Sequence, residues 1–327
     1  MNLMDLNQSD RCVNFSCPER SVSPAAYILL YVCSAAVVLL TVCGNLLVII
    51  SVFHFKQLHT PTNMLVLSLA VSDFFVGAIV MPPMLIWIIE SCWILGRDFC
   101  TSYLLINGFI TVVSIYNIAL IAVDRYLALS NPFLYMNHVS VRITCVVIVF
   151  DWSVVMAYNL ALLYFNGNFK NFFMCPGECI SFLNEVCSII ELFVSFIFPL
   201  SVIIILYTRV FVIAKKHATV IRELNNHTRP ETQKITSHSM KSERKAAKVL
   251  GILVSVFLIC LLPYFIFSLF SEIQEEAIHK IIVIIYLNST INPFIYALFY
   301  PWFRRCIKLI ITLQIFQADS ALINILT

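Results

Sequence analysis

The stretch AYILLYVCSAAVVLLTVCGNLLVIIS, residues 26–51, contains no charged side chain and exceeds the roughly 20 apolar residues that an α-helix needs to cross a bilayer. Six further apolar runs follow, at about 63–89, 100–123, 144–165, 186–213, 248–270 and 281–299. Hydrophobic residues make up 60% of the 327 positions and charged residues only 12%, which excludes an ordinary soluble domain. The runs predict an all-α membrane protein, a bundle of seven transmembrane helices.

The basic residues lie mainly at one end of these runs. Sixteen of the 21 Lys and Arg residues fall in the first, third and fifth connections and in the tail, and five fall on the opposite side. Because cytosolic loops carry the excess of Lys and Arg, we expect the N-terminus outside the cell and the C-terminus in the cytosol. Residues 1–25 lack the apolar core of a cleavable signal, so the first run is expected to direct its own insertion. The net charge of +3 gives no reason to expect a nucleic-acid partner.

Three regions follow from this topology. Residues 1–25 are an extracellular segment, residues 26–300 are the membrane domain with a cytosolic loop at about 214–247, and residues 301–327 are a cytosolic tail. The tail begins with a pattern that predicts a short amphipathic helix lying along the membrane and in contact with its lipids. The residues that suggest it are Trp302, Phe303, Arg304, Arg305, Ile307 and Leu309.

Three positions are candidates for covalent modification. Asn7 and Asn14 begin glycosylation sequons in the segment expected outside the cell, whereas similar matches at Asn226 and Asn288 fall in the cytosol and inside a helix and are discounted. Cys306 follows the last run beside two arginines, which is a pattern for palmitoylation. An unmodified thiol at Cys306 is the alternative.

Four acids lie inside the apolar runs: Asp73, Asp124, Asp151 and Glu191. An ionisable side chain at membrane depth costs roughly 2.5–3.5 kcal/mol on insertion scales, so each one calls for a partner or a function. Asp124 precedes Arg125, and an adjacent opposite charge lets both side chains stay ionised. This pair is either an anchor for the helix end or a latch that opens. For Asp151 the sequence suggests no role beyond protonation or a bond to a neighbouring helix.

Asp73 lies near the middle of the second run, and no basic residue lies near it in any run. Its expected company is polar, namely Ser114, Asn288, Ser289 and Asn292. Such a set either coordinates a small cation such as sodium or holds the acid protonated.

Prolines interrupt several of the runs and predict kinks, because proline removes a helical hydrogen bond and clashes with the carbonyl four residues earlier. A kink either fits the packing or serves as a hinge. The prolines are Pro82, Pro83, Pro199, Pro263 and Pro293.

Residues in all seven runs, taken in order, resemble the pattern of rhodopsin-like G-protein-coupled receptors. They are Asn45, Leu69-Ala70-Val71-Ser72-Asp73, Asp124-Arg125-Tyr126, Trp152, Pro199, Tyr207, Pro263 and Asn292-Pro293-Phe294-Ile295-Tyr296. The stretch NSTINPFIYALFYPWF at residues 288–303 is similar to the signature of trace amine-associated receptors. The resemblance implies a multi-pass plasma-membrane receptor for amines with an olfactory role, coupled to a heterotrimeric G protein of the stimulatory or olfactory type.

The resemblance also assigns roles to particular residues. It implies disulfides Cys100–Cys179 and Cys175 to an N-terminal cysteine, Cys17 rather than Cys12. It implies a sodium or switch site of Asp73, Ser114, Asn288, Asn292 and Tyr296, and G-protein coupling through Asp124, Arg125, Tyr126 and Tyr207.

Two positions depart from the family pattern. Amine receptors usually carry an aspartate seventeen positions before the Asp-Arg-Tyr aspartate, and Asn107 stands there, so this position has no charge to pair with a ligand ammonium. Leu261 replaces the tryptophan expected two positions before Pro263, so activation is expected to use another residue, such as Phe257.

Glu191 is the remaining candidate counter-ion. It precedes Pro199 by eight residues, about two helical turns toward the outside, and Ser195 lies one turn below it. Some trace amine-associated receptors without the third-helix aspartate carry an acid at this place, and this sequence resembles them. The other expected ligand contacts are Asn107, Tyr264, Phe265 and Tyr286, for which plain packing is the alternative.

The sequence leaves one close alternative, another aminergic or orphan receptor in which Glu191 is structural. A transporter is disfavoured by seven runs without an inverted repeat, and a light receptor by the absence of a lysine inside the seventh run. An enzyme is not expected, because no paired acids, metal-ligand cluster or nucleophile with its base occurs at membrane depth.

Overall fold

The computed structural model describes residues 17, 23–166, 177, 179, 183–225, 249, 251–263, 266, 275–317 and 320–325, and every regular element among them is helical. The first half of the chain contains α2 (Pro24–His54), η1 (Lys56–Leu58), α3 (Pro61–Phe75), η2 (Val76–Val80), α4 (Met81–Glu90), α5 (Arg97–Ser130), α6 (Pro132–His138) and α7 (Val141–Phe165). The second half contains α8 (Glu185–Leu192), η3 (Phe193–Ile197), α9 (Phe198–Asn225), a helix at Gly251–Pro263, α11 (Glu275–Phe299), α12 (Pro301–Ile311), η4 (Gln314–Phe316) and η5 (Ser320–Leu322).

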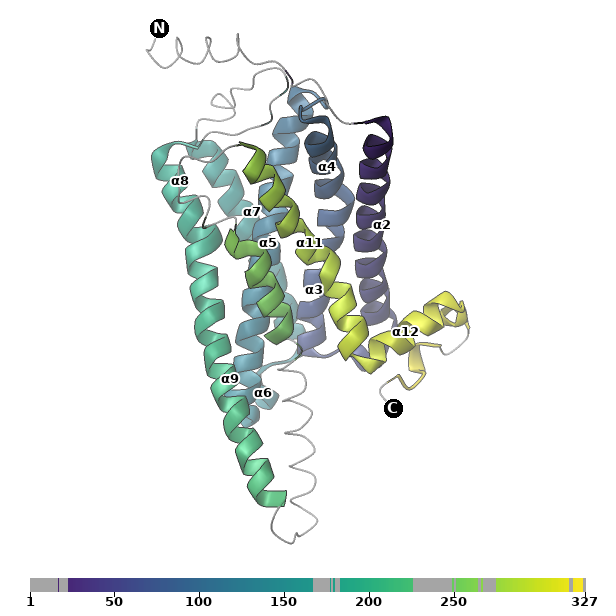
Figure 1. Ribbon diagram of the computed structural model, residues 1–327. Coiled ribbons are helices and arrows are strands. Elements are labelled where there is room, and N and C mark those ends of the chain that lie inside the picture. The colour runs from purple at the N-terminus through teal and green to yellow at the C-terminus, as the bar shows by residue number, and fades with distance from the viewer. Residues whose placement is uncertain are drawn as a thin grey trace.

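The long helices run side by side as a bundle, and α12 leaves it nearly at a right angle (Figure 1). Five of them are long and apolar enough to cross a membrane: Pro24–His54, Pro61–Glu90, Arg97–Ser130, Val141–Phe165 and Glu185–Lys216. Val283–Phe299 is joined to α12 by a bend of 102°. The sixth predicted run is described mainly between 251 and 263. The predicted all-helical membrane bundle and its short C-terminal helix are confirmed.

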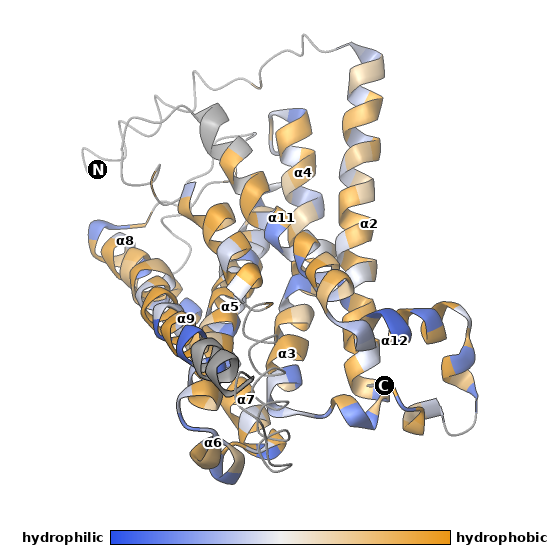
Figure 2. Ribbon diagram, turned by 60° about the horizontal axis from the view of Figure 1, so that its bottom comes forward, coloured by the Kyte–Doolittle hydropathy of each residue, from blue (hydrophilic) through white to orange (hydrophobic). Residues whose placement is uncertain are grey.

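The interior of the bundle contains both polar and apolar side chains, whereas its outer surface is mainly apolar. The helix α5 lies in the middle of the bundle, where it packs against α3, α7 and α9. In contrast, α7 buries only Thr144 and Val155 and presents the rest of its apolar surface outward. Apolar residues cover the helices along most of their length (Figure 2), as expected where the surrounding medium is lipid.

The predicted proline kinks occur as wide helical turns. The carbonyls that Pro82 and Pro83 deprive of a partner belong to residues 78 and 79, which lie in the π-helical turn η2. The corresponding residue for Pro199 is Ser195, in the second π-helical turn η3. A π turn absorbs one extra residue within an otherwise α-helical segment, and such turns are frequent at functional sites. Both turns lie in the half of the bundle that faces outward by the charge rule.

Among the described residues, two disulfides join segments at this outer end. The predicted Cys100–Cys179 bond is present, with the two Cα atoms 5.7 Å apart. Cys17, however, pairs with Cys92, their Cα atoms 5.5 Å apart, which corrects the expected Cys17–Cys175 bond. Cys92 follows directly on the C-terminus of α4, so the bond ties the N-terminal segment to the second span. Cys175, Asn7 and Asn14 lie outside the described residues.

At the other end, the segment after α12 folds back against the first span. The side chain of Ile325 is 2% exposed and belongs to the main apolar core. Its backbone N–H donates to Gln57 Oε1 at 3.1 Å, and Ser320 Oγ is 2.9 Å from His54 Nε2. Residues 320–325 therefore pack on the connection between α2 and α3 (Figure 1).

Candidate functional site

The centre of the bundle contains a buried carboxylate with three polar neighbours. Asp73 is 0% exposed, and its Oδ1 accepts hydrogen bonds from Ser289 Oγ at 2.7 Å and Ser114 Oγ at 3.3 Å. Its Oδ2 accepts from Asn292 Nδ2 at 2.7 Å. The structure thus brings together Asp73, Ser114, Ser289 and Asn292 from α3, α5 and α11, as the sequence predicted.

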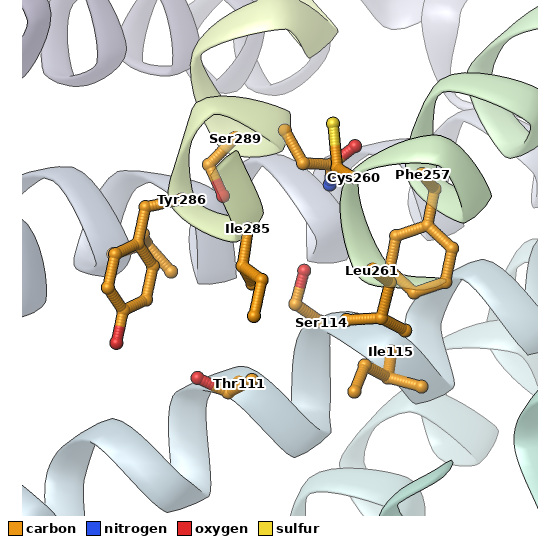
Figure 3. A pocket seen from close by; sticks show the side chains of 11 residues that line it. Thr111, Ser114, Ile115, Phe257, Cys260, Leu261, Ile285, Tyr286 and Ser289 are labelled. Carbon is orange, nitrogen blue, oxygen red and sulfur yellow. The ribbon is translucent and has the colours of Figure 1, made fainter. Parts of the chain in front are cut away.

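Asn288, the fourth predicted neighbour, does not bond to Asp73. Its Oδ1 is buried and has no hydrogen-bond partner among the described residues. It lines a cavity of about 20 Å³, together with Ser114, Ser289 and Tyr286, which has room for a water molecule or a small ion (Figure 3). Oxygen atoms without donors around a buried carboxylate are the kind of donor set that a hard cation prefers. The oxygens of Ser114, Asn288 and Ser289 around this cavity are therefore suited to a small cation, whereas Asp73 itself does not line it.

The same cavity explains how Leu261 takes the place of the expected tryptophan. Leu261 points toward Ser114 and Ile115, with Phe257 beside it (Figure 3). Both Leu261 and Phe257 are 4% exposed and belong to the main apolar core. The packing at this depth is thus made by Leu261 and Phe257 together.

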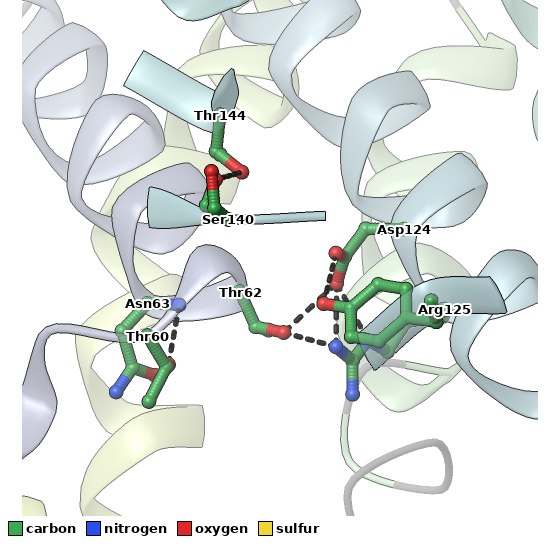
Figure 4. A network of polar contacts seen from close by, with 8 residues as sticks. Thr60, Thr62, Asn63, Asp124, Arg125, Ser140 and Thr144 are labelled. Atoms are coloured by element: carbon green, nitrogen blue, oxygen red, sulfur yellow. Dashed lines mark hydrogen bonds and ion pairs between the residues drawn. The ribbon is translucent and has the colours of Figure 1, made fainter. Parts of the chain in front are cut away.

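The end of α5 that the charge rule places in the cytosol carries a closed ion pair. Arg125 Nε donates to Asp124 Oδ2 at 2.9 Å, and both side chains are about 5% exposed. Two further donors hold the carboxylate: Thr62 Oγ1 contacts Oδ2 at 2.9 Å, and the Tyr135 hydroxyl contacts Oδ1 at 2.7 Å (Figure 4). Arg125 also donates to Thr62. The latch proposed from sequence therefore joins α5 to α3 and α6.

Tyr135 and Thr62 were not predicted from sequence. Burial and the negative charge of Asp124 raise the pKa of Tyr135 to about 12, so the phenol stays a donor at physiological pH. A single hydroxyl residue in a loop or at a helix start gives no sequence signal for such a role.

Tyr207 on α9 and Tyr296 on α11 are both predicted to act in signalling. Both hydroxyls are buried and have no hydrogen-bond partner among the described residues. Leaving a buried hydroxyl unpaired costs about 1–3 kcal/mol, so a rearrangement that gives either one a partner is favoured by that amount. Tyr126, by contrast, packs with Leu129 and Val210 in a small cluster.

Glu191 lies in the last turn of α8, directly before the wide turn η3 that holds the buried Ser195. Its Oε2 accepts a hydrogen bond from the hydroxyl of Tyr158 on α7. Among the described residues no basic side chain forms an ion pair with it. Glu191 is therefore oriented by an uncharged partner, Tyr158, that the sequence analysis missed.

Of the other predicted ligand contacts, the structure describes Asn107 and Tyr286. Tyr286 donates a hydrogen bond of 2.9 Å to Asn107 Oδ1, which also accepts from Thr111 at 3.3 Å. The hydrogen bond between Asn107 and Tyr286 thus links α5 to α11. Tyr264 and Phe265 lie outside the described residues.

The Oδ2 atom of Asp151 on α7 is buried and has no hydrogen-bond partner among the described residues.

Cys306 is 0% exposed, and burial raises the pKa of its thiol to about 11. Because the thiolate is the nucleophile and access is needed for acylation, this packing argues against the predicted palmitoylation.

Comparison with known proteins supports one family throughout the chain. A family model described as 7 transmembrane receptor (rhodopsin family) matches residues 44–296. The chain is 38% identical over 326 residues to trace amine-associated receptor 13c of Danio rerio, covering 96% of this chain and 95% of the relative. It is 39% identical over 324 residues to trace amine-associated receptor 6 of Rattus norvegicus, covering 96% and 94%. It is 36% identical over 325 residues to trace amine-associated receptor 1 of Homo sapiens, covering 94% and 95%.

Proposed function

We propose, from the premise that the chain belongs to the rhodopsin-family seven-transmembrane receptors and among them to the trace amine-associated receptors, that it binds an ammonium ligand through Glu191 and transmits binding to a G protein. Members of this family are receptors, so the chain is a multi-pass membrane protein and not an enzyme. The plasma membrane, an extracellular N-terminus and a stimulatory or olfactory type of G protein complete the proposal.

The observation that carries this proposal is a membrane-depth carboxylate that has no cationic partner among the residues the structure describes. Glu191 lies within the span Glu185–Lys216, and its described neighbour Tyr158 offers a hydroxyl rather than a positive charge. A carboxylate in that setting is stabilised by any cation that reaches it. An amine is the cation that the names of the trace amine-associated relatives suggest.

Signalling requires the ligand to favour one of two arrangements of the bundle. In this arrangement Arg125 is held by Asp124 and Thr62, and the Tyr207 hydroxyl has no hydrogen-bond partner within the described part of the chain. Opening the latch would free Arg125 to meet Tyr207 and expose the cytosolic face to a G protein. Sodium at Asp73, held with Ser114, Ser289 and Asn288, would stabilise the resting arrangement through its charge.

The test is an amine screen of cells expressing the chain, with cAMP accumulation as readout, repeated on Glu191→Gln. Losing one partner of a buried ion pair costs about 3–5 kcal/mol, which is about two to three decades in affinity. We therefore expect a potency loss of that size with surface expression retained. Asp98→Asn is the control, because Asp98 is an exposed carboxylate in the first turn of α5 that does not line the cavity beside Asn288, and its loss should change potency less than threefold.

The second candidate is a receptor in which Glu191 is structural, and the bond from Tyr158 favours it. In that case Glu191→Gln, which still accepts the bond, leaves amine potency within threefold while the receptor reaches the surface. That outcome would overturn the assignment of Glu191 and leave the receptor family standing.

A further inference from the structure

The wide turn η3 leaves one backbone carbonyl without a donor from its own helix. In this turn the N–H of Phe198 donates to the carbonyl of Phe193, five residues earlier. The carbonyl of Val194 would receive the next bond of this kind from residue 199, which is proline and has no N–H. Neither Phe198, the α-helical donor, nor Pro199 therefore serves the carbonyl of Val194.

A tyrosine on the central helix supplies the missing donor. The hydroxyl of Tyr116 on α5 donates to the carbonyl oxygen of Val194 at 2.9 Å. A carbonyl without a partner is costly at membrane depth, because the hydrocarbon layer holds no water that could replace the donor. The ring of Tyr116 packs with Val112, Val113 and Val155, which holds it in place. The side chain of Tyr116 thus substitutes for a helical N–H.

This hydrogen bond favours the wide turn over an ordinary helix. In an α-helix the N–H of Phe198 would donate to Val194, four residues earlier, and Pro199 would instead deprive the carbonyl of Ser195. The Tyr116 hydroxyl would then meet a carbonyl that already has its helical donor. Its hydrogen bond is therefore needed only while the turn is wide.

The width of the turn also determines where Glu191 points. Glu191 lies just before the turn, and its Oε2 accepts the hydrogen bond from Tyr158 on α7. A turn narrower by one residue would rotate everything before it relative to α9, Glu191 included. Tyr116 interacts electrostatically with Glu191, with Asp151 and with Tyr158, so its hydroxyl belongs to the same polar cluster.

We propose that Tyr116 is a positioning residue whose hydrogen bond to the Val194 carbonyl holds η3 wide and so keeps Glu191 directed toward Tyr158. The proposal concerns the receptor without ligand. Its consequence for amine recognition rests on the proposed function of Glu191.

The first test restores the missing N–H. Pro199→Ala gives residue 199 a backbone donor, which makes the Tyr116 hydroxyl dispensable. Tyr116→Phe should lower the unfolding temperature of the detergent-solubilised receptor by several degrees when residue 199 is proline, and hardly at all when it is alanine. Thr208→Ala is the control, because Thr208 Oγ1 donates to the Ile204 carbonyl within its own exposed helix face. Its effect should be small and the same in both backgrounds.

The second test reports where Glu191 points, again without ligand. Tyr158→Phe removes the hydroxyl that donates to Glu191 and should lower the unfolding temperature of the wild type. In the Tyr116→Phe receptor Glu191 no longer faces Tyr158, so the same substitution should have little further effect. A Tyr116 that only filled space would give additive losses.

Amine potency gives a third readout. If Glu191 binds the ligand, Tyr116→Phe should lower potency at least fivefold and should not lower it further in the Glu191→Gln receptor. Unchanged potency in Tyr116→Phe beside a loss in Glu191→Gln would contradict the positioning role. If Glu191→Gln itself leaves potency unchanged, the proposed function fails, and the two stability tests still judge Tyr116.

Two stability results would overturn the inference. One is an equal loss from Tyr116→Phe with proline and with alanine at residue 199, and the other is additivity of Tyr116→Phe and Tyr158→Phe. Should Tyr116→Phe fail to reach the cell surface, surface expression becomes the readout. Adding Pro199→Ala should then restore expression, and a lack of recovery would equally refute the role of Tyr116.

Discussion

The side chain of Asn45 on α2 donates through Nδ2 to the backbone carbonyl of Ser289 on α11, at 3.0 Å. That carbonyl lies four residues before Pro293, so it is the one that proline deprives of its helical donor. Asn45 Nδ2 also donates to Thr41 O at 2.9 Å, which fixes its direction. The first span thus repairs the defect that the seventh contains, beside the Asp73 site to which Ser289 also donates.

Replacing Asn45 by Ala should destabilise the receptor, because a buried carbonyl left unpaired costs about 1–3 kcal/mol. The measurement is thermal unfolding of the detergent-solubilised protein, compared with Ser153→Ala. Ser153 bonds only to the carbonyl of Val149 in its own exposed helix face, so its loss should be nearly neutral. Equal stability of the two variants would contradict the repair role of Asn45.

Tyr135→Phe should raise ligand-independent signalling. It removes one of the donors that hold Asp124 in the closed latch, and a hydrogen bond to a charged group contributes about 1.5–3 kcal/mol. If only a small fraction of receptors has an open latch, a shift of that size increases the open fraction at least tenfold. Basal cAMP per receptor at the cell surface is the readout, with Tyr164→Phe as control because Tyr164 is 65% exposed at the opposite end of the bundle. Unchanged basal signalling would mean that Thr62 and Arg125 hold the latch alone.

Asp73→Asn should abolish the sensitivity of agonist potency to sodium. An ion that prefers the resting arrangement lowers agonist affinity, and such couplings are about 5- to 150-fold. Potency is compared in sodium and potassium chloride at equal ionic strength. The wild type should gain potency without sodium, while the variant should not change. A wild type indifferent to the exchange would remove sodium from the proposal and leave the hydrogen bonds of Asp73 intact.

Ile325→Ala should release the segment that packs on the connection between α2 and α3. The side chain is 2% exposed in the main core, and truncating a buried isoleucine costs about 2–5 kcal/mol. Hydrogen exchange of peptides spanning residues 314–325 should become faster. Leu322→Ala is the control, since Leu322 is 62% exposed in the same segment and its truncation should leave the protection unchanged.

The sequence predicted the parts of the site that follow from depth within a span. Asp73 and its neighbours Ser114, Ser289 and Asn292 meet as expected, because polar residues at similar depth in apolar helices have only one another to pair with. Depth alone does not give direction around a helix axis. Tyr158 was therefore missed as the partner of Glu191, since one tyrosine in an apolar run looks like packing.

Other features depended on long-range geometry. The prolines indicated kinks, but the π turns that absorb them depend on how each helix packs on its neighbours. The partner of Cys17 was assigned to Cys175, whereas the structure places it beside Cys92. Cysteine spacing does not distinguish such pairings, because any of several loops can reach the same N-terminal cysteine.

The direction in which the Glu191 side chain points depends on the number of residues in the wide turn Phe193–Ile197 as well as on their types. Shortening that turn by one position would restore an ordinary α-helix and swing the acid by about 100° around the axis, away from Tyr158. An insertion or deletion of a single codon there would thus re-aim the charge with every side chain preserved. Ligand preference in such receptors has a route to change that substitution scans would not sample.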